Sequence, residues 1–181
     1  MKDVYARIVR HERPDLVPRA ELLNDMIESV FSKVIPKDAS IIQYGCACGY
    51  LLDTFKANGY TNLTGVDKDP DMAKDWMEGV KFIPSTARWA LKDQRPHDVV
   101  LIHRFLYLLP DTEQTEEIYR LLVKGFTKYL IIIEEEVGEN GDGRPSRYYR
   151  NYQPIFESLG LKQTLESSGR VQNVTLRVFT K

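Results

Sequence analysis

The chain has 181 residues and a formal net charge of −1, with 43% hydrophobic and 28% charged residues, the balance of an ordinary soluble globular protein. This near-neutral charge gives no overall attraction to nucleic acid or membrane, and no apolar run approaches the roughly 20 residues that span a bilayer. We therefore expect no membrane or nucleic-acid partner, while a homodimer stays open. The first seven residues lack the apolar stretch of a signal peptide, so we expect a cytoplasmic location.

Before residue 40 the sequence predicts one or two helices, which form a helical cap (residues 1–39) on a single domain (residues 40–181). Pro14 and Pro18 interrupt the helical pattern because proline lacks the N–H group that a helix interior needs. The region also contains four arginines, Arg7, Arg10, Arg13 and Arg19. We expect them to form a solvated, charged helix face, with part of a lid as the alternative.

From residue 40 to residue 133, short apolar runs alternate with segments of helical spacing, which is typical of βαβ units and a mainly parallel sheet. The predicted strands cover residues 41–44, 62–66, 80–83, 98–102 and 129–133. Helices are predicted after the first four strands, one of them over residues 85–92 and the others ending at Gly59, Gly79 and Gly125. Asp69-Pro70 opens the second helix, and Asp111 is expected to cap the fourth, with Gln114 in the capping-box position.

The C-terminal part changes character. A helix is predicted over residues 152–159, with Asn151 as its cap and Pro154 in its first turn. Two strands, over residues 162–167 and 173–180, follow with no helix between them. These two strands therefore predict an antiparallel hairpin at the end of the chain.

The most informative stretch is Gln-Tyr-Gly-Cys-Ala-Cys-Gly, residues 43–49. A buried strand ends here in a loop of small residues, which lets a backbone approach a ligand closely, and the loop turns into a helix whose N-terminus favours a negative group. Dinucleotide-binding loops follow the spacing G-x-G-x-x-G. The small residues here lie at positions 45, 47 and 49, which argues against a pyrophosphate ligand and against an NAD-dependent oxidoreductase.

The only two cysteines, Cys46 and Cys48, lie in this loop. They are too few for a disulfide scaffold or a closed four-thiolate zinc site. We expect both to be compact fillers of the loop rather than redox or metal-binding groups, and we expect no metal ion.

Asp67 ends the next predicted strand, in the sequence Gly65-Val66-Asp67. A carboxylate at this strand end can accept hydrogen bonds from both ribose hydroxyls of an adenosine cofactor. The alternative is that Asp67 only caps the turn before Pro70. The loop upstream favours the ribose role.

Together these features resemble the class I S-adenosylmethionine-dependent methyltransferases, from about Ser40 to Lys181. The resemblance implies a three-layer αβα sandwich with a mainly parallel seven-stranded sheet, in which the last strand of the C-terminal hairpin inserts antiparallel. It implies S-adenosylmethionine as cofactor, with the loop around its methionine part. The cofactor-binding residues are then Gln43, Tyr44, Gly45, Cys46, Ala47, Gly49, Asp67, Lys68, Thr86, Ala87 and His103.

Three residues depart from the pattern of this family. Gln43 stands where an acidic residue usually anchors the loop, so it brings an acceptor but no charge. Ala47 replaces the middle glycine, a mild change at negative φ and a strained one otherwise. Thr86 lies where an acid commonly meets the adenine amine. Because these three contacts with the cofactor would be weaker, a partner subunit that binds the cofactor without catalysis is the alternative to an active enzyme.

The fourth strand ends at His103 and Arg104, which should face the ligand crevice because ligands bind at the carboxyl ends of strands in such sheets. His103 is the candidate catalytic base, or else it contacts the cofactor through its backbone. Substrate-binding residues are expected among the side chains that border this crevice: Arg104, Tyr107, Glu136, Arg147 and Tyr148.

Glu134, Glu135 and Glu136 form an acidic run after the fifth strand. Like charges in a row resist burial, so we expect most of them to reach water. The alternative is that one or two line the acceptor pocket and pair with a substrate amine or hold Mg²⁺.

The guanidinium and phenol groups around residues 144–152 suit an anionic or aromatic acceptor, unless they only form a solvated loop. The leading hypothesis is an enzyme that moves a methyl group from S-adenosylmethionine to an O or N atom of a small-molecule acceptor. An RNA or peptide methyltransferase is the alternative acceptor class.

Overall fold

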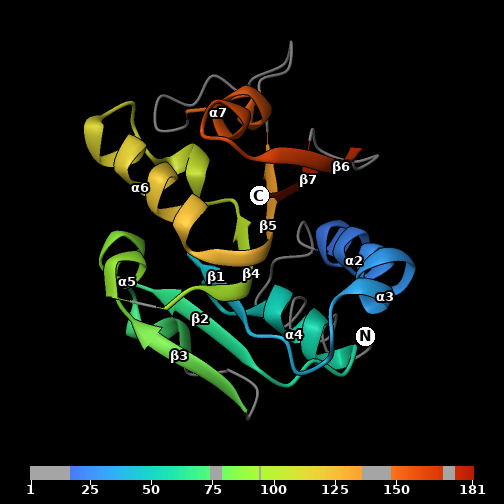
Figure 1. The fold of residues 1–181 in the computed structure, drawn as a ribbon. Helices are drawn as coiled ribbons and strands as arrows, with labels where there is room; N and C mark the ends of the chain where they lie inside the picture. Colours follow the sequence, from blue (N-terminus) through green and yellow to red (C-terminus); the bar gives the residue numbers. More distant parts are fainter. Residues whose placement is uncertain (1–16, 74–78, 94, 136–147, 169–173) are drawn as a thin grey trace.

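The computed structural model describes residues 17–73, 79–93, 95–135, 148–168 and 174–181 (Figure 1). Its centre is a seven-stranded sheet in the order β3-β2-β1-β4-β5-β7-β6. The strands are β1 (Ile41–Tyr44), β2 (Leu63–Asp67), β3 (Val80–Pro84), β4 (His97–His103), β5 (Phe126–Glu135), β6 (Lys162–Ser168) and β7 (Val174–Thr180). The first five run parallel, and β7 pairs antiparallel with both β5 and β6. The predicted sheet and inserted hairpin strand are confirmed.

Helices cover both faces of this sheet (Figure 1). One face carries α2 (Val17–Met26), η2 (Ile27–Phe31), α3 (Ser32–Val34) and α4 (Tyr50–Ala57). The other carries α5 (Ala87–Asp93), α6 (Glu113–Lys124) and α7 (Tyr152–Ser158). Two short 3₁₀ helices, η3 (Pro70–Ala73) and η4 (Leu106–Leu108), follow β2 and β4. The chain therefore forms the predicted three-layer αβα sandwich.

Alternation along the strands separates the two cores. Ile41, Val99 and Leu101 pack with α2 and α4, whereas Ile42 and Val100 pack with α5, α6 and α7, because successive strand side chains point to opposite faces. Since both faces are covered, the central strands are mainly apolar, as expected of buried parallel strands, and Gln43 of β1 is a buried polar exception.

The N-terminal segment differs from the expected charged face. Arg19 of α2 is only 3% exposed because its guanidinium pairs with Glu135 at 2.7 Å. Leu23 and Ile27 join the core under α2 and α4. The expected solvation is thus wrong for Arg19, while Arg7, Arg10 and Arg13 lie outside the described residues.

The start of α6 also differs from the prediction. Thr112, not Asp111, is the N-cap and accepts a hydrogen bond from the Thr115 N–H group at 3.4 Å. The Asp111 carboxylate pairs instead with Arg150, whose guanidinium also donates a hydrogen bond to the Leu109 carbonyl at 2.7 Å. A tertiary partner has therefore displaced the local cap, and the expected capping box with Gln114 does not form. The helix expected from Asp69-Pro70 begins as η3, and residues 74–78 are not described.

Candidate functional site

The loop between β1 and α4 depends on three left-handed residues. Gly45 has a φ of +67°, Ala47 of +46° and Gly49 of +74°. Glycine adopts these values without steric cost, whereas the Cβ atom of Ala47 costs about 1–2 kcal/mol. The small residues at alternate positions thus have a conformational cause. Ala47 has a positive φ, the case in which the replacement of the middle glycine by alanine is strained.

Cys46 fixes this loop to the sheet. Its N–H group donates to the Val66 carbonyl at 3.0 Å, and its side chain is 1% exposed within the core. Burial raises the pKa of the Cys46 thiol, which makes a reactive thiolate unfavourable. The predicted packing role is confirmed for Cys46.

Asp67 at the tip of β2 touches the same loop. Its Oδ2 atom accepts a hydrogen bond from the Ala47 N–H group at 2.9 Å, and Oδ1 accepts one from the Asp69 N–H group at 3.1 Å. The turn-capping alternative is therefore part of what Asp67 does. Each carboxylate oxygen can accept a further hydrogen bond, and the side chain is partly exposed, so the carboxylate is still able to receive a ligand.

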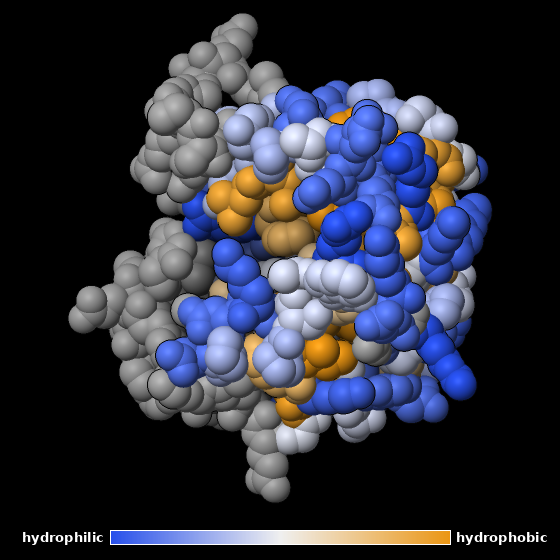
Figure 2. Space-filling view, turned by 90° about the vertical axis from the view of Figure 1, so that its left-hand side faces the viewer, coloured by the Kyte–Doolittle hydropathy of each residue, from blue (hydrophilic) through white to orange (hydrophobic). Residues whose placement is uncertain are grey.

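Asp67 lines a cavity of about 610 Å³ beside the loop. Lys68 and the β3–α5 connection, with Thr86 and Ala87, line one side of it. Phe105, Leu108 and Leu109, which surround η4, form another wall, and α6 closes the cavity with Gln114 and Ile118. Figure 2 shows the face that carries α5 and α6, where hydrophilic residues surround patches of hydrophobic ones. The cavity lies at the carboxyl ends of β1 and β2, where ligands bind in open α/β sheets.

The structure divides the residues predicted for the site. Those that line the cavity are Gly45, Ala47, Asp67, Lys68, Thr86, Ala87 and Arg104. Those that lie elsewhere are Gln43, Tyr44, Cys46, Gly49, His103, Tyr107 and Tyr148. Glu136 and Arg147 lie outside the described residues. The cavity therefore gathers mainly the residues predicted for the adenosine half of the cofactor.

Gln43 lies below the loop, on β1. It is 1% exposed, and no described residue donates a hydrogen bond to its Oε1 atom. A buried acceptor without a donor is costly, by about 1–3 kcal/mol. A ligand or water molecule that donates to Gln43 would remove this cost, so the unmet acceptor fits a cofactor seated on the loop.

His103 faces the layer of α2 and α4 rather than the cavity. It is 6% exposed, and the Tyr50 hydroxyl lies 3.0 Å from its Nδ1 atom and 3.1 Å from Nε2. The two rings meet edge to face, with centroids 5.5 Å apart. Tyr50 is the first residue of α4, so this pair links the tip of β4 to the start of the helix that follows the loop.

A second polar group lies at the tips of β4 and β5. Glu135 pairs with Arg19 at 2.7 Å and with Arg104 at 3.3 Å, and it accepts a hydrogen bond from the Tyr149 hydroxyl at 3.4 Å. Tyr149 stacks on Tyr107, with ring centroids 5.8 Å apart. Arg104 has a φ of +47°, a conformation that non-glycine residues keep only when their surroundings hold them in it.

The expectation that most of the acidic run reaches water is wrong for the two acids that the structure describes. Glu134 is fully buried, and burial raises its pKa to about 8, so the carboxyl group is mainly neutral at pH 7. Glu135 is 15% exposed because two guanidinium groups compensate its charge. Glu136 is not described.

Sequence reasoning missed the wall around η4. Phe105, Leu108 and Leu109 directly follow β4, and a place at a strand tip was the signal that could have identified them. Trp89, 62% exposed at the cavity, was missed as well. A single exposed tryptophan carries no periodic signal.

No protein-family model matches this sequence, and neither does any curated protein sequence. Solved structures do match the fold. Magnesium protoporphyrin IX methyltransferase from Synechocystis PCC 6803 with bound SAH (S-adenosylhomocysteine) has a TM-score of 0.70 and 14% identity, over 90% of this chain and 82% of that one.

Two further structures agree. A SAM-dependent methyltransferase from Archaeoglobus fulgidus has a TM-score of 0.66 and 18% identity, over 90% of this chain and 94% of that one. An O-methyltransferase family protein from Burkholderia thailandensis has a TM-score of 0.70 and 14% identity, over 93% of this chain and 56% of that one. The described part of the chain contains no helix with the length and apolar character of a membrane span.

Because these methyltransferase structures match over most of the chain, this chain has the fold of the class I S-adenosylmethionine-dependent methyltransferases.

Proposed function

We propose that this protein transfers a methyl group from S-adenosylmethionine to an O or N atom of a small-molecule acceptor. The observation that carries the proposal is the position of Asp67, which touches the left-handed loop and opens into the adjoining cavity. The methyltransferase structures of the same fold support it. In this proposal residues 40–181 form the methyltransferase domain and residues 1–39 its helical cap.

The residues of the cavity suit the parts of the cofactor. Asp67 would accept hydrogen bonds from the two ribose hydroxyls, and Phe105 and Ile118 offer apolar surfaces to the adenine. Thr86 could accept a hydrogen bond from the adenine amine. The methionine part would follow the loop toward Gly49, where the first N–H groups of α4 favour a carboxylate.

Bound S-adenosylmethionine supplies an electrophilic methyl group, so the protein must chiefly hold an unprotonated acceptor in line with it. His103 is the candidate proton acceptor, with its ring oriented by the Tyr50 hydroxyl. Its other candidate role is a contact with the cofactor through its backbone. Arg104, Tyr107 and Tyr148, with Glu136 and Arg147, are proposed to bind the acceptor.

A cofactor-binding partner subunit without catalysis is the second candidate. The strained φ of Ala47 and the lack of charge on Gln43, which stands where the family usually has an acidic residue, favour it, since both weaken the binding of the cofactor. Transfer activity separates this candidate from the first.

The test is calorimetric titration of the purified protein with S-adenosylmethionine, SAH and NAD. We expect both sulfur ligands to bind and NAD not to bind. Asp67→Ala should weaken both sulfur ligands by roughly 10- to 100-fold, the equivalent of about 1.5–3 kcal/mol for a charge-assisted hydrogen bond. Asp71→Ala is the matched control, because Asp71 is exposed and does not line the cavity.

Three outcomes are decisive. Tight NAD binding without either sulfur ligand would overturn the proposal. Binding of the sulfur ligands without methyl transfer to any member of a broad acceptor panel would favour the partner subunit. Strong salt dependence of acceptor binding would favour RNA over a small molecule.

A further inference from the structure

The wall around η4 lies against the glycine loop. A methyl group on Gly45 would come within 2.8 Å of Cδ2 of Phe105, so the Phe105 ring packs directly on the loop. Leu108 and Leu109 continue the same wall of the cavity. Any shift of η4 therefore changes both the loop and the cavity.

Glu134 binds the backbone N–H groups at the start of η4. Its Oε1 atom accepts hydrogen bonds from the Phe105 N–H group at 2.7 Å and from the Leu106 N–H group at 2.9 Å. These are donors at the start of a helix, which have no partner within the helix itself. Because Glu134 is fully buried on β5, no water competes with it for these donors.

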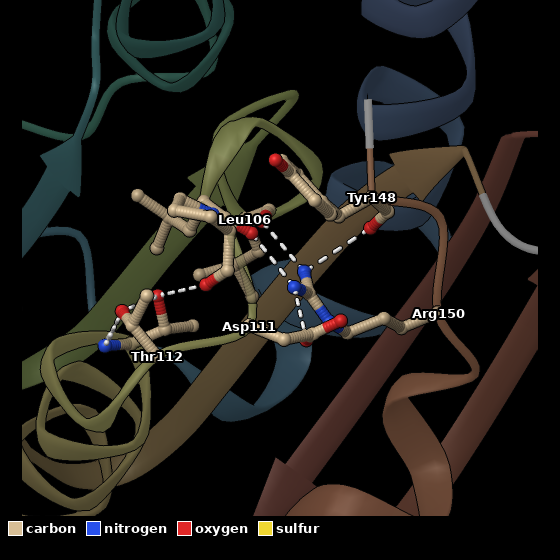
Figure 3. Close-up of polar contacts among 8 residues, drawn as sticks. Leu106, Asp111, Thr112, Tyr148 and Arg150 are labelled. Atoms are coloured by element: carbon tan, nitrogen blue, oxygen red, sulfur yellow. Dashed lines mark hydrogen bonds and ion pairs between the residues drawn. The ribbon is translucent and has the colours of Figure 1, made fainter. Parts of the chain in front are cut away.

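Arg150 binds backbone carbonyl groups of η4 and of the residue that follows it (Figure 3). Its guanidinium donates to the Leu106 carbonyl at 3.2 Å and to the Leu109 carbonyl at 2.7 Å. It also donates to the Tyr148 carbonyl at 3.1 Å and pairs with Asp111. The side chain is only 11% exposed. Arg150 thus joins the segment before α7 to both ends of the stretch from 106 to 111.

We propose that Glu134 and Arg150 are positioning residues that fix the wall of the cavity from opposite ends of η4, and so set the affinity of the cofactor. Glu134 acts through Phe105 on the loop, and Arg150 acts through the carbonyl groups of Leu106 and Leu109. The inference rests on the proposed function, because η4 is a wall of the cavity assigned to S-adenosylmethionine.

The surroundings of Glu134 support a positioning role over simple packing. Its Oε2 atom and the hydroxyls of Tyr119 and Tyr152 are buried without a hydrogen-bond partner among the described residues. Packing alone would favour an apolar side chain here, since an unpartnered buried polar group is destabilising. The part of the carboxyl group that is satisfied is the oxygen that binds η4.

The test compares Glu134→Ala with Glu134→Gln, which keeps an oxygen acceptor for the two N–H groups, and adds Arg150→Ala. In the protein without ligand, hydrogen exchange of the peptide that covers residues 103–109 should become at least ~10-fold faster in both alanine variants. Glu134→Gln should keep most of the protection. Glu116→Ala and Arg120→Ala, an exposed pair on α6, are the matched controls and should leave this peptide unchanged.

Calorimetry with SAH then measures the consequence. We expect the two alanine variants to bind SAH at least ~10-fold more weakly and Glu134→Gln to recover most of the affinity. Unchanged exchange in both alanine variants, or a glutamine variant as impaired as Glu134→Ala, would overturn the inference. If the unsubstituted protein binds no SAH, the proposed function fails, and the exchange measurement still decides whether Glu134 and Arg150 hold η4.

Discussion

Replacement of Gly45 by alanine tests the contact between the loop and η4 most directly. The residue has a φ of +67°, which costs an alanine about 1–2 kcal/mol. Its new methyl group would lie 2.8, 3.0 and 3.1 Å from three carbon atoms of Phe105, and such overpacking costs about 1–3 kcal/mol. We therefore expect Gly45→Ala to lower the free energy of unfolding by about 2–5 kcal/mol.

Gly59→Ala separates the two contributions. Gly59 has a φ of +85° and no atom within 4 Å of the added methyl group, so only the conformational cost of about 1–2 kcal/mol should appear. The double variant Gly45→Ala/Phe105→Ala should lack the steric part, as a double-mutant cycle would show. Denaturant unfolding measures all of these variants. If Gly45→Ala costs no more than Gly59→Ala, Phe105 does not pack on the loop as described.

Ala47→Gly should relieve the strain at φ +46° and raise the free energy of unfolding by up to ~1 kcal/mol, whereas Ala57→Gly, at the end of α4, should lower it; equal signs would contradict the strain. His103→Ala should reduce turnover by ~10²-fold if the imidazole accepts a proton, and unchanged turnover would remove that role. The pKa of Glu134, raised from 4.5 to about 8, means that the folded state keeps a proton that the unfolded state loses. Stability should therefore fall by up to ~1.4 kcal/mol per pH unit between these values, and Glu134→Gln should abolish that slope in pH-dependent unfolding; a parallel slope in both proteins would disprove the shift.

Local signals in the sequence were sufficient for most of the fold. β1 matches its predicted bounds because a buried parallel strand is a mainly apolar run that ends at turn residues. α7 begins as predicted, since Asn151 accepts a hydrogen bond from the Gln153 N–H group at 3.1 Å and Pro154 lies in the first turn. In both elements the stabilising groups are close together in the sequence.

The failures have a common cause in partners from distant segments. Asp111 is a good N-cap residue by type, but Arg150, 39 residues later, binds its carboxylate. Arg19 and Glu135 are each poor candidates for burial alone, and each becomes buried because the other neutralises it. No local pattern indicates such a pair.

The two strained residues of the site are each held by a carboxylate from a neighbouring strand. Asp67 binds the N–H group of Ala47, and Glu135 binds the guanidinium of Arg104. Strain of this kind persists only where the surroundings determine the conformation. Asp67 therefore has two roles in the proposed enzyme, because the carboxylate offered to the ribose also holds the loop on which the methionine part would rest. An affinity lost in Asp67→Ala consequently includes a contribution from the loop, and the same substitution in the relaxed Ala47→Gly background should lack the part of that contribution that comes from the strain.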